Sequence, residues 1–236
     1  MATYKGIRGH TIRTVAGDIS PVALGDIWYS NTARKIRVGK TTAGAWATGG
    51  AVPVEVNSQA VGGTQTAAIS ASGTAPGGDT VNVQQYDGSS WTEIANVNTG
   101  RNGIRGAGST TAFVAWGGSN KSPPEGLLTE EFNGTSWTEV SGSLNTVRYN
   151  SAATGTATAA LATGGNAHDP MSDANESYDG STWTELADLN TARQAPASSG
   201  ITTAAICFGG GNPGYLDVSE TWDNSSWTEG NNLNTA

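Results

Sequence analysis

A tryptophan that recurs every 44 to 46 residues constrains this chain more than any other feature of its sequence. Each copy ends a short motif made of an aromatic residue, Asp, a small polar turn and then the tryptophan, with Asn in place of Asp in one copy. The in-phase tryptophans are Trp91, Trp137, Trp183 and Trp227, with Trp46 one period earlier. A fixed period of this length indicates a repeat architecture, in which each unit buries its apolar face against its neighbours.

Other signals keep the same phase and predict four short strands per repeat. An aromatic residue precedes the tryptophan, a glycine pair ends an apolar run, and an Asn-Thr-x-Arg link opens the next repeat. The Asp-Gly or Asn-Gly type turn before the tryptophan is a strong hairpin signal. The aromatic residues are Tyr86, Phe132, Tyr178 and Trp222; the glycine pairs are Gly117 and Gly118, Gly164 and Gly165, and Gly209 and Gly210; the arginines are Arg101, Arg148 and Arg193. The first copy is degenerate at the glycine pair.

Composition agrees with an all-β chain. Glycine is abundant at 33 residues and charged residues are only 14% of the chain, which suits short strands joined by tight turns. The single cysteine, Cys207, lies in an apolar run, so we expect a buried, inert thiol and no intramolecular disulfide. The start of the chain has no apolar signal core, and no window approaches a membrane span, so we expect a soluble, cytoplasmic protein unless it is assembled into a particle.

A glycine pair after an apolar strand, then an aromatic residue and a tryptophan, resembles the kelch repeat over residues 52–232. Here four residues separate the aromatic residue from the tryptophan, where the family more often has about six, which shortens one hairpin. The resemblance implies a small β-propeller of four full repeats, occupying residues 51–236. It also implies that the tryptophans, the aromatic residues and the glycine pairs form the structural core between blades. Four repeats are few for this family, so residues 25–50 are expected to add a partial fifth blade.

Residues 1–50 differ from the repeats in charge and pattern. Residues 1–40 carry seven basic and two acidic side chains, a net +5, whereas the rest of the chain carries five basic and eighteen acidic ones, a net −13. The segment Gly25–Val38 predicts a hairpin and resembles one found in bacteriophage tail-fibre and virion appendage proteins, which implies a docking or assembly arm. The alternatives are a first blade with an arm, and a solvated basic surface.

No constellation of catalytic residues stands out. His10 and His168 lie in different modules, so neither a metal site nor a cofactor is predicted, and the crosslink and histidine ligands of the copper radical oxidases that share kelch-like repeats have no counterpart. The turn at Asp179 resembles the Asp-box of sialidases, which is structural there also. The three in-phase arginines could ring a central channel and bind a carboxylate or glycan, or make one structural hydrogen bond at each link.

The loops between the glycine pair and the next strand vary from repeat to repeat. Variable loops on a rigid scaffold are typical of a binding face, although drift in solvated loops gives the same pattern. The candidate ligand-binding side chains in these loops are Lys121, Glu125, His168, Asp169, Asp173 and Tyr215, with the three arginines added.

Three functions follow as hypotheses. The first is a non-enzymatic virion structural protein, a tail-fibre or capsid-appendage component. Its residues 1–50 would contact other virion proteins in a homo-oligomer such as a trimer, and its loops would attach to a host surface glycan or a protein. The second is a cellular kelch-type protein-interaction module, and the third is a carbohydrate-active hydrolase. The acidic repeats argue against a nucleic-acid partner.

Overall fold

The computed structural model describes three strands in the first part of the chain, then residues 49–118, 125–166 and 171–234. The chain divides into two compact units, Met1–Thr48 and Gly49–Ala236. In the first unit, β1 (Arg13–Val15) pairs in parallel with β2 (Ile27–Ser30), which pairs antiparallel with β3 (Lys35–Val38). The hairpin expected from the sequence is therefore present. Trp46 lies outside the described residues.

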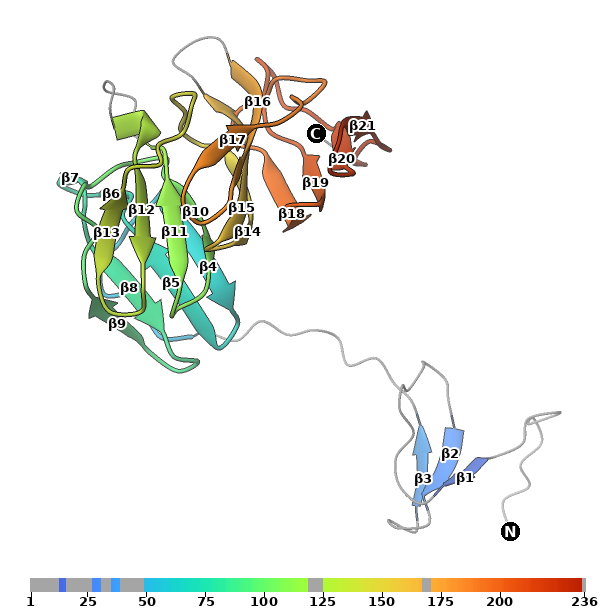
Figure 1. Ribbon diagram of the computed structural model, residues 1–236. Helices are drawn as coiled ribbons and strands as arrows, with labels where there is room; N and C mark the ends of the chain where they lie inside the picture. The colour runs from blue at the N-terminus through green and yellow to red at the C-terminus, as the bar shows by residue number, and fades with distance from the viewer. Residues whose placement is uncertain are drawn as a thin grey trace, which may run out of the picture. The chain divides into compact units, whose positions relative to one another are not determined.

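The second unit consists of four antiparallel sheets of four strands each, which follow one another along the chain (Figure 1). We name them blades A to D. Blade A contains β4 (Ala60–Thr64), β5 (Ala67–Ala71), β8 (Val83–Tyr86) and β9 (Trp91–Ile94). Blade B contains β10 (Arg105–Gly108), β11 (Phe113–Trp116), β12 (Thr129–Phe132) and β13 (Trp137–Val140).

Blade C contains β14 (Ala152–Thr156), β15 (Ala159–Asn166), β16 (Met171–Tyr178) and β17 (Trp183–Glu185). Blade D contains β18 (Ala197–Ile201), β19 (Ala204–Phe208), β20 (Ser219–Trp222) and β21 (Trp227–Glu229). Two short strands, β6 (Thr74–Ala75) and β7 (Gly78–Asp79), form a small hairpin in blade A, and a 3-10 turn, η1 (Glu125–Leu127), precedes β12. The fold is thus an all-β, four-bladed β-propeller arrangement.

Each blade begins at its inner strand, and these inner strands lie side by side. β4 packs against β10, β10 against β14, and β14 against β18. Within the described residues, β18 and β4 do not pack closely in the same way. The expected fifth-blade strand is not among the four sheets, because β2 and β3 pair with β1 instead.

The core is divided between the three blade-to-blade interfaces. One cluster joins blades A and B around Ile69 and Phe113, a second joins B and C around Val114 and Trp183, and a third joins C and D around Leu161. In every blade the aromatic residue at the end of the third strand stacks at a tilt on the tryptophan of the fourth, with ring centroids 5.0 to 5.5 Å apart. In blades B, C and D the aromatic residue and the tryptophan of each pair are buried, at most 7% exposed.

The glycine pairs are required by backbone conformation. All six glycines of blades B to D adopt a positive φ, between 61° and 109°, a region that side chains with a Cβ rarely occupy. In blade A, Ser72 takes the first position with φ of 57°. The carbonyl oxygens of Thr80 and Arg101 lie 2.8 and 3.1 Å from its hydroxyl oxygen, which has one hydrogen to donate between them, and the Arg101 N–H donates to that hydroxyl at 2.9 Å.

Candidate binding face

The link before each of blades B, C and D is fastened by a buried ion pair. Arg101 lies 2.9 Å from Glu130 and Arg193 lies 2.6 Å from Glu220; Arg148 and Glu176 form the third pair. The three arginine side chains are fully buried. Burial lowers the pKa of Arg101 and Arg148, and the attraction of the partner glutamate opposes that shift.

Each glutamate of these pairs also fixes the link backbone. The N–H groups of Asn98, Asn145 and Asn190 donate to the second carboxylate oxygen at 2.7 to 2.8 Å. The arginine in turn donates to carbonyl oxygens of its own blade, as Arg101 does to Gly117 and Leu128. We call this arrangement of link backbone, arginine and glutamate the joint. Its buried polar groups form hydrogen bonds with one another, which offsets the cost of removing them from water.

The sequence left two interpretations of the in-phase arginines open. The structure places Arg101, Arg148 and Arg193 inside the joints, where no part of the side chain reaches solvent. This geometry agrees with the interpretation that each arginine makes structural hydrogen bonds at its link, and the charges of arginine and glutamate strengthen these bonds. A ligand on the surface has no access to these guanidinium groups.

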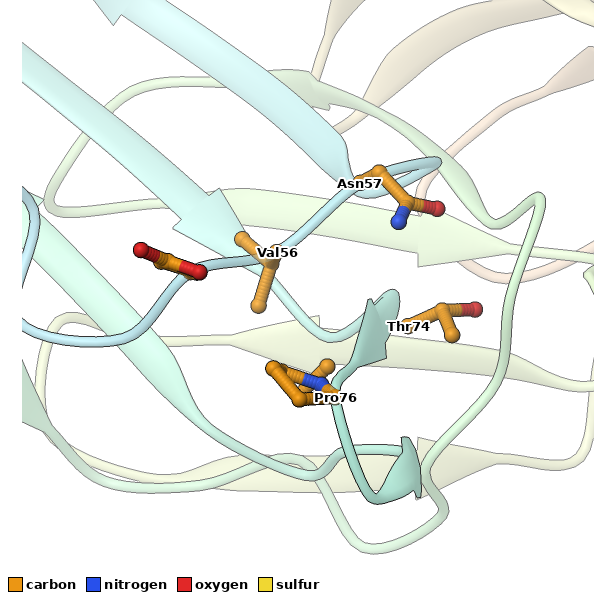
Figure 2. A pocket seen from close by; sticks show the side chains of 6 residues that line it. Val56, Asn57, Thr74 and Pro76 are labelled. Atoms are coloured by element: carbon orange, nitrogen blue, oxygen red, sulfur yellow. The ribbon is translucent and has the colours of Figure 1, made fainter.

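Blade A has the same joint without charges. Val56 occupies the arginine position and Gln84 the glutamate position of the repeat. The Gln84 amide accepts from the Val54 N–H at 3.3 Å and donates to the Val54 carbonyl oxygen at 3.0 Å. A pocket of about 220 Å³ opens beside Val56, between the link residue Asn57 and the residues Thr74 and Pro76 near β6 (Figure 2).

The described residues between the second and third strands of blades B and D lie beside the links: the Gly126 carbonyl oxygen accepts from the Arg148 N–H, and the Gly211 carbonyl oxygen accepts from the Gln194 N–H. Of the loop residues predicted to bind a ligand, Lys121, His168 and Asp169 fall outside the described residues. Glu125 opens the 3-10 turn η1 and is half-buried. Asp173 and Tyr215 are exposed, with 89% of Tyr215 accessible to solvent.

Tyr215 stands at the rim of a pocket on this face. The pocket has a volume of about 710 Å³ and is bounded by Gln194, Pro213 and the backbone of Gly210, Gly211 and Gly214. The Gln194 side-chain oxygen accepts a hydrogen bond of 2.8 Å from Asn166, which fixes the amide plane. An exposed aromatic ring beside an oriented amide can bind a ligand that has both an apolar and a polar face.

A second hollow on blade C is acidic. It has a volume of about 380 Å³, and its lining includes Asp173, Glu185 and Asp188. Thr146 and Met171 lie at its margin. Among the described residues, no group of three or more His, Cys, Asp and Glu is placed to hold a metal ion.

Sequence reasoning missed Arg105, which is part of no repeated motif. Its guanidinium donates to the Ser151 carbonyl oxygen, its own neighbour Ile104 and the Asn150 side chain, at 3.0 to 3.1 Å. It therefore ties blade B to blade C, and burial lowers its pKa. The other blades have alanine at this position, Ala60, Ala152 and Ala197, so periodicity carries no signal for it.

The opposite mouth of the propeller is lined by small residues of all four inner strands. This opening, about 250 Å³, includes Gly62, Gly106, Thr154 and Ser199. Cys207 is buried in the interface between blades C and D, and burial raises the pKa of its thiol to about 12, so a reactive thiolate does not form there.

No helix of the described residues is long and apolar enough to cross a membrane. Comparison with protein-family models and with curated proteins finds no match to this chain. The assignment of fold therefore comes from the chain's own repeats and structure: it is a four-bladed, all-β propeller arrangement preceded by a separate three-stranded unit.

Proposed function

We propose that this chain is a non-enzymatic recognition module of kelch type, and that it binds a host surface glycan through the pocket beside Tyr215. The observation that carries the proposal is the contrast between Tyr215 and the in-phase arginines. Tyr215 is 89% exposed at the rim of a pocket, whereas all three arginines are held in buried ion pairs. A sugar ring stacks its C–H face on an aromatic ring and offers its hydroxyl groups to amide and backbone groups.

Residues 1–50 suggest the assembly in which this module works. We propose that it is a component of a virion appendage, a tail fibre or capsid decoration, because the sequence pattern Gly-Asp-Ile-Trp-Tyr at residues 25–29 resembles that of tail-fibre proteins and its last three residues belong to the hairpin of β2 and β3. In this role residues 1–50 contact other virion proteins and the loops face the host cell. Mass spectrometry of purified particles should then detect peptides of this chain; its presence solely as free protein in infected cells would contradict the virion role.

Glycan binding is tested on a glycan array with the full chain and with Tyr215→Ala. We expect the variant to lose binding by about tenfold or more, because the stacking surface is removed. Val61→Ala is the matched control, since Val61 is also exposed but lines the opposite mouth of the propeller. Equal binding by parent and Tyr215→Ala contradicts the site, and release of cleaved sugar by the parent contradicts the non-enzymatic assignment.

The acidic hollow on blade C favours a second candidate, a protein-interaction module that binds a basic segment of its partner. Asp173, Glu185 and Asp188 supply the negative field that attracts such a segment. Binding to a lysine-rich peptide would then weaken steeply with salt. Neutralising the three carboxylates should abolish that binding and leave glycan binding intact.

A further inference from the structure

The hairpin turn between the third and fourth strands carries an aspartate in three blades and an asparagine in one. The aspartates are Asp87, Asp179 and Asp223, and Asn133 takes their place in blade B. In each of the four turns the side-chain oxygen accepts from the N–H groups of the residues two and three positions later, at 2.8 to 2.9 Å. The turn therefore holds an amide and a carboxylate in the same way.

The residue that follows Asn133 makes its side-chain amide reactive. This residue is Gly134, and both side by side are exposed to solvent. The backbone nitrogen after an asparagine can attack the side-chain carbonyl carbon, which closes a succinimide ring and releases ammonia. Glycine offers the least hindered nitrogen because it has no Cβ. No described residue accepts a hydrogen bond from the Gly134 N–H, so water has access to the proton that must be removed.

Two donors point at the atom on which negative charge develops in this reaction. The N–H groups of Thr135 and Ser136 both donate to Asn133 Oδ1 at 2.9 Å. When the Gly134 nitrogen adds to Cγ, this oxygen becomes the oxyanion of a tetrahedral intermediate, and donors already in place stabilise such a charge. The leaving nitrogen, Asn133 Nδ2, lies 3.4 Å from Ser136 Oγ. A hydroxyl group is therefore at hand where the departing ammonia needs a proton.

We propose that Asn133 is a site of self-catalysed deamidation, at which the turn of blade B converts its own asparagine to aspartate. The Gly134 nitrogen gives its proton to water and bonds to Cγ, the bond between Cγ and Nδ2 breaks, and ammonia leaves. Water then adds to Cγ, the bond between Cγ and the ring nitrogen breaks, and Gly134 regains its N–H. The net reaction consumes water, releases ammonia and involves no oxidation or reduction.

The same donors select the product of ring opening. Water can attack the succinimide at Cγ, which gives aspartate, or at the backbone carbonyl carbon, which gives isoaspartate and lengthens the main chain. The two N–H groups polarise the Cγ carbonyl and so favour the first route. The aspartate product also keeps the hydrogen bond of 3.2 Å from the N–H of residue 133 to the Ser136 carbonyl oxygen. Asp179 shows that a carboxylate fits this turn, since it accepts from the Ser181 N–H and hydroxyl, each at 2.8 Å.

The chain contains a second Asn-Gly pair that lacks these features. Asn102 is half-buried and Gly103 is buried, in the segment that leads into blade B. The Asn102 side-chain amide donates to the two carboxylate oxygens of Asp79, at 3.2 and 3.4 Å. No described residue donates a hydrogen bond to its Oδ1. Because the dipeptide is the same, the difference in rate between the two sites measures what the turn contributes.

The test follows both amides by peptide mass spectrometry while the full, folded chain is incubated in mildly alkaline buffer. We expect Asn133 to convert about tenfold or more faster than Asn102, since one hydrogen bond to a developing charge supplies at least that factor. Electron-transfer fragmentation should identify most of the product as aspartate. In the chain unfolded in urea, we expect the two sites to react at similar rates and to give mainly isoaspartate.

The matched variant is Gly134→Asn, because Asn224 holds the same position in blade D with φ of 75°. It places a Cβ beside the attacking nitrogen and should retain the Asn133 amide, with an unchanged circular dichroism spectrum. Equal rates at Asn133 and Asn102 in the folded chain, or isoaspartate as the main product there, overturn the proposal. Loss of the Asn133 amide from Gly134→Asn as fast as from the parent also overturns it.

Discussion

Blade A and the three later blades fasten the same joint with different chemistry. Blades B, C and D bury an arginine against a glutamate, and blade A has Val56 and Gln84 at those positions. Both charges are absent together in blade A. Since a buried charge without its partner is costly, the comparison teaches that a joint can hold both charges or neither without leaving one charge buried alone.

The comparison extends to the backbone atoms that the two joints hold. The Thr146 N–H donates to Glu176 and its carbonyl oxygen accepts from Arg148. In blade A, the Gln84 amide alone serves the N–H and carbonyl of Val54. A neutral amide therefore replaces two charged side chains and forms hydrogen bonds with the N–H and carbonyl groups of the equivalent link residue.

The largest effect is expected when one charge is removed from a complete pair. Glu176→Gln leaves Arg148 buried without a counter-charge and should lower the free energy of unfolding by about 3–5 kcal/mol. Urea denaturation measures the change, with the exposed Glu185→Gln as control. A loss no larger than that of the control would mean that the pair is not essential to the joint.

Converting the whole joint of blade C to that of blade A should recover most of that loss. In the double variant Arg148→Val with Glu176→Gln, the new amide can bond Thr146 as Gln84 bonds Val54, and no charge is left buried. We expect a net cost of about 1–2 kcal/mol, the scale of a changed hydrogen bond and a small cavity. A double-mutant cycle by urea denaturation gives the coupling energy, and additive losses would contradict the pairwise exchange.

A smaller gain is expected from a difference between blades A and B. The indole N–H of Trp183 donates to Thr129 of blade B at 2.9 Å. The indole N–H of Trp137 is buried and has no hydrogen-bond partner among the described residues, and Val83 of blade A stands at the position equivalent to Thr129. Val83→Thr should add about 1 kcal/mol to the free energy of unfolding by supplying the missing acceptor. Val114→Thr, in an apolar interface, should instead destabilise the chain; equal losses in both variants would disprove the role of the indole.

The smallest effect concerns the hairpin turns. The N–H groups of Ser181 and Thr182 donate to the Asp179 carboxylate, and these bonds lower its pKa to about 2 from an ordinary 3.8. Because the folded pKa is depressed, the turn contributes stability above pH 3.8 that is lost as the pH falls toward 2. Blade B has Asn133 at this position, with the same backbone bonds and no titration there.

The test compares the thermal midpoints of the parent and Asp179→Asn at several pH values. We expect the parent to be the more stable above pH 3.8, and the difference to shrink as the pH falls toward 2. A difference that does not change with pH would assign the contribution of the turn to its geometry and not to the carboxylate.

The order of strands within a blade was readable from the sequence because its determinants are local. The Asp-Gly turn sets the hairpin between the third and fourth strands, and the glycine pair supplies the positive φ values after the second strand. The phase of the tryptophans then predicted which aromatic residues pack between blades. The hairpin at residues 27–38 was visible for the same reason, but its pairing with β1 was not.

The candidate site was less predictable, because exposure depends on neighbours far away in the sequence. Tyr215 was found as a residue of a variable loop, and its pocket is seen only in the structure. Arg105 was missed, since it repeats in no other blade. A glutamate in a short strand would be expected to face solvent, but Glu130 is buried. Its arginine partner lies 29 residues earlier in the chain, so the sequence around Glu130 does not indicate the pair.

The sequence by itself determined the repeat, the four-stranded unit and the aromatic pairs, since turns, glycine conformations and alternation act within a few residues. Tertiary structure decided what each repeated position does. The three in-phase arginines are structural because the neighbouring strands bury them: Arg101, Arg148 and Arg193. Ile206 is exposed and its counterpart Leu161 is buried, because no fifth sheet of the described residues covers Ile206. Burial is a property of the neighbouring blade, and a repeat motif does not encode whether that neighbour is present.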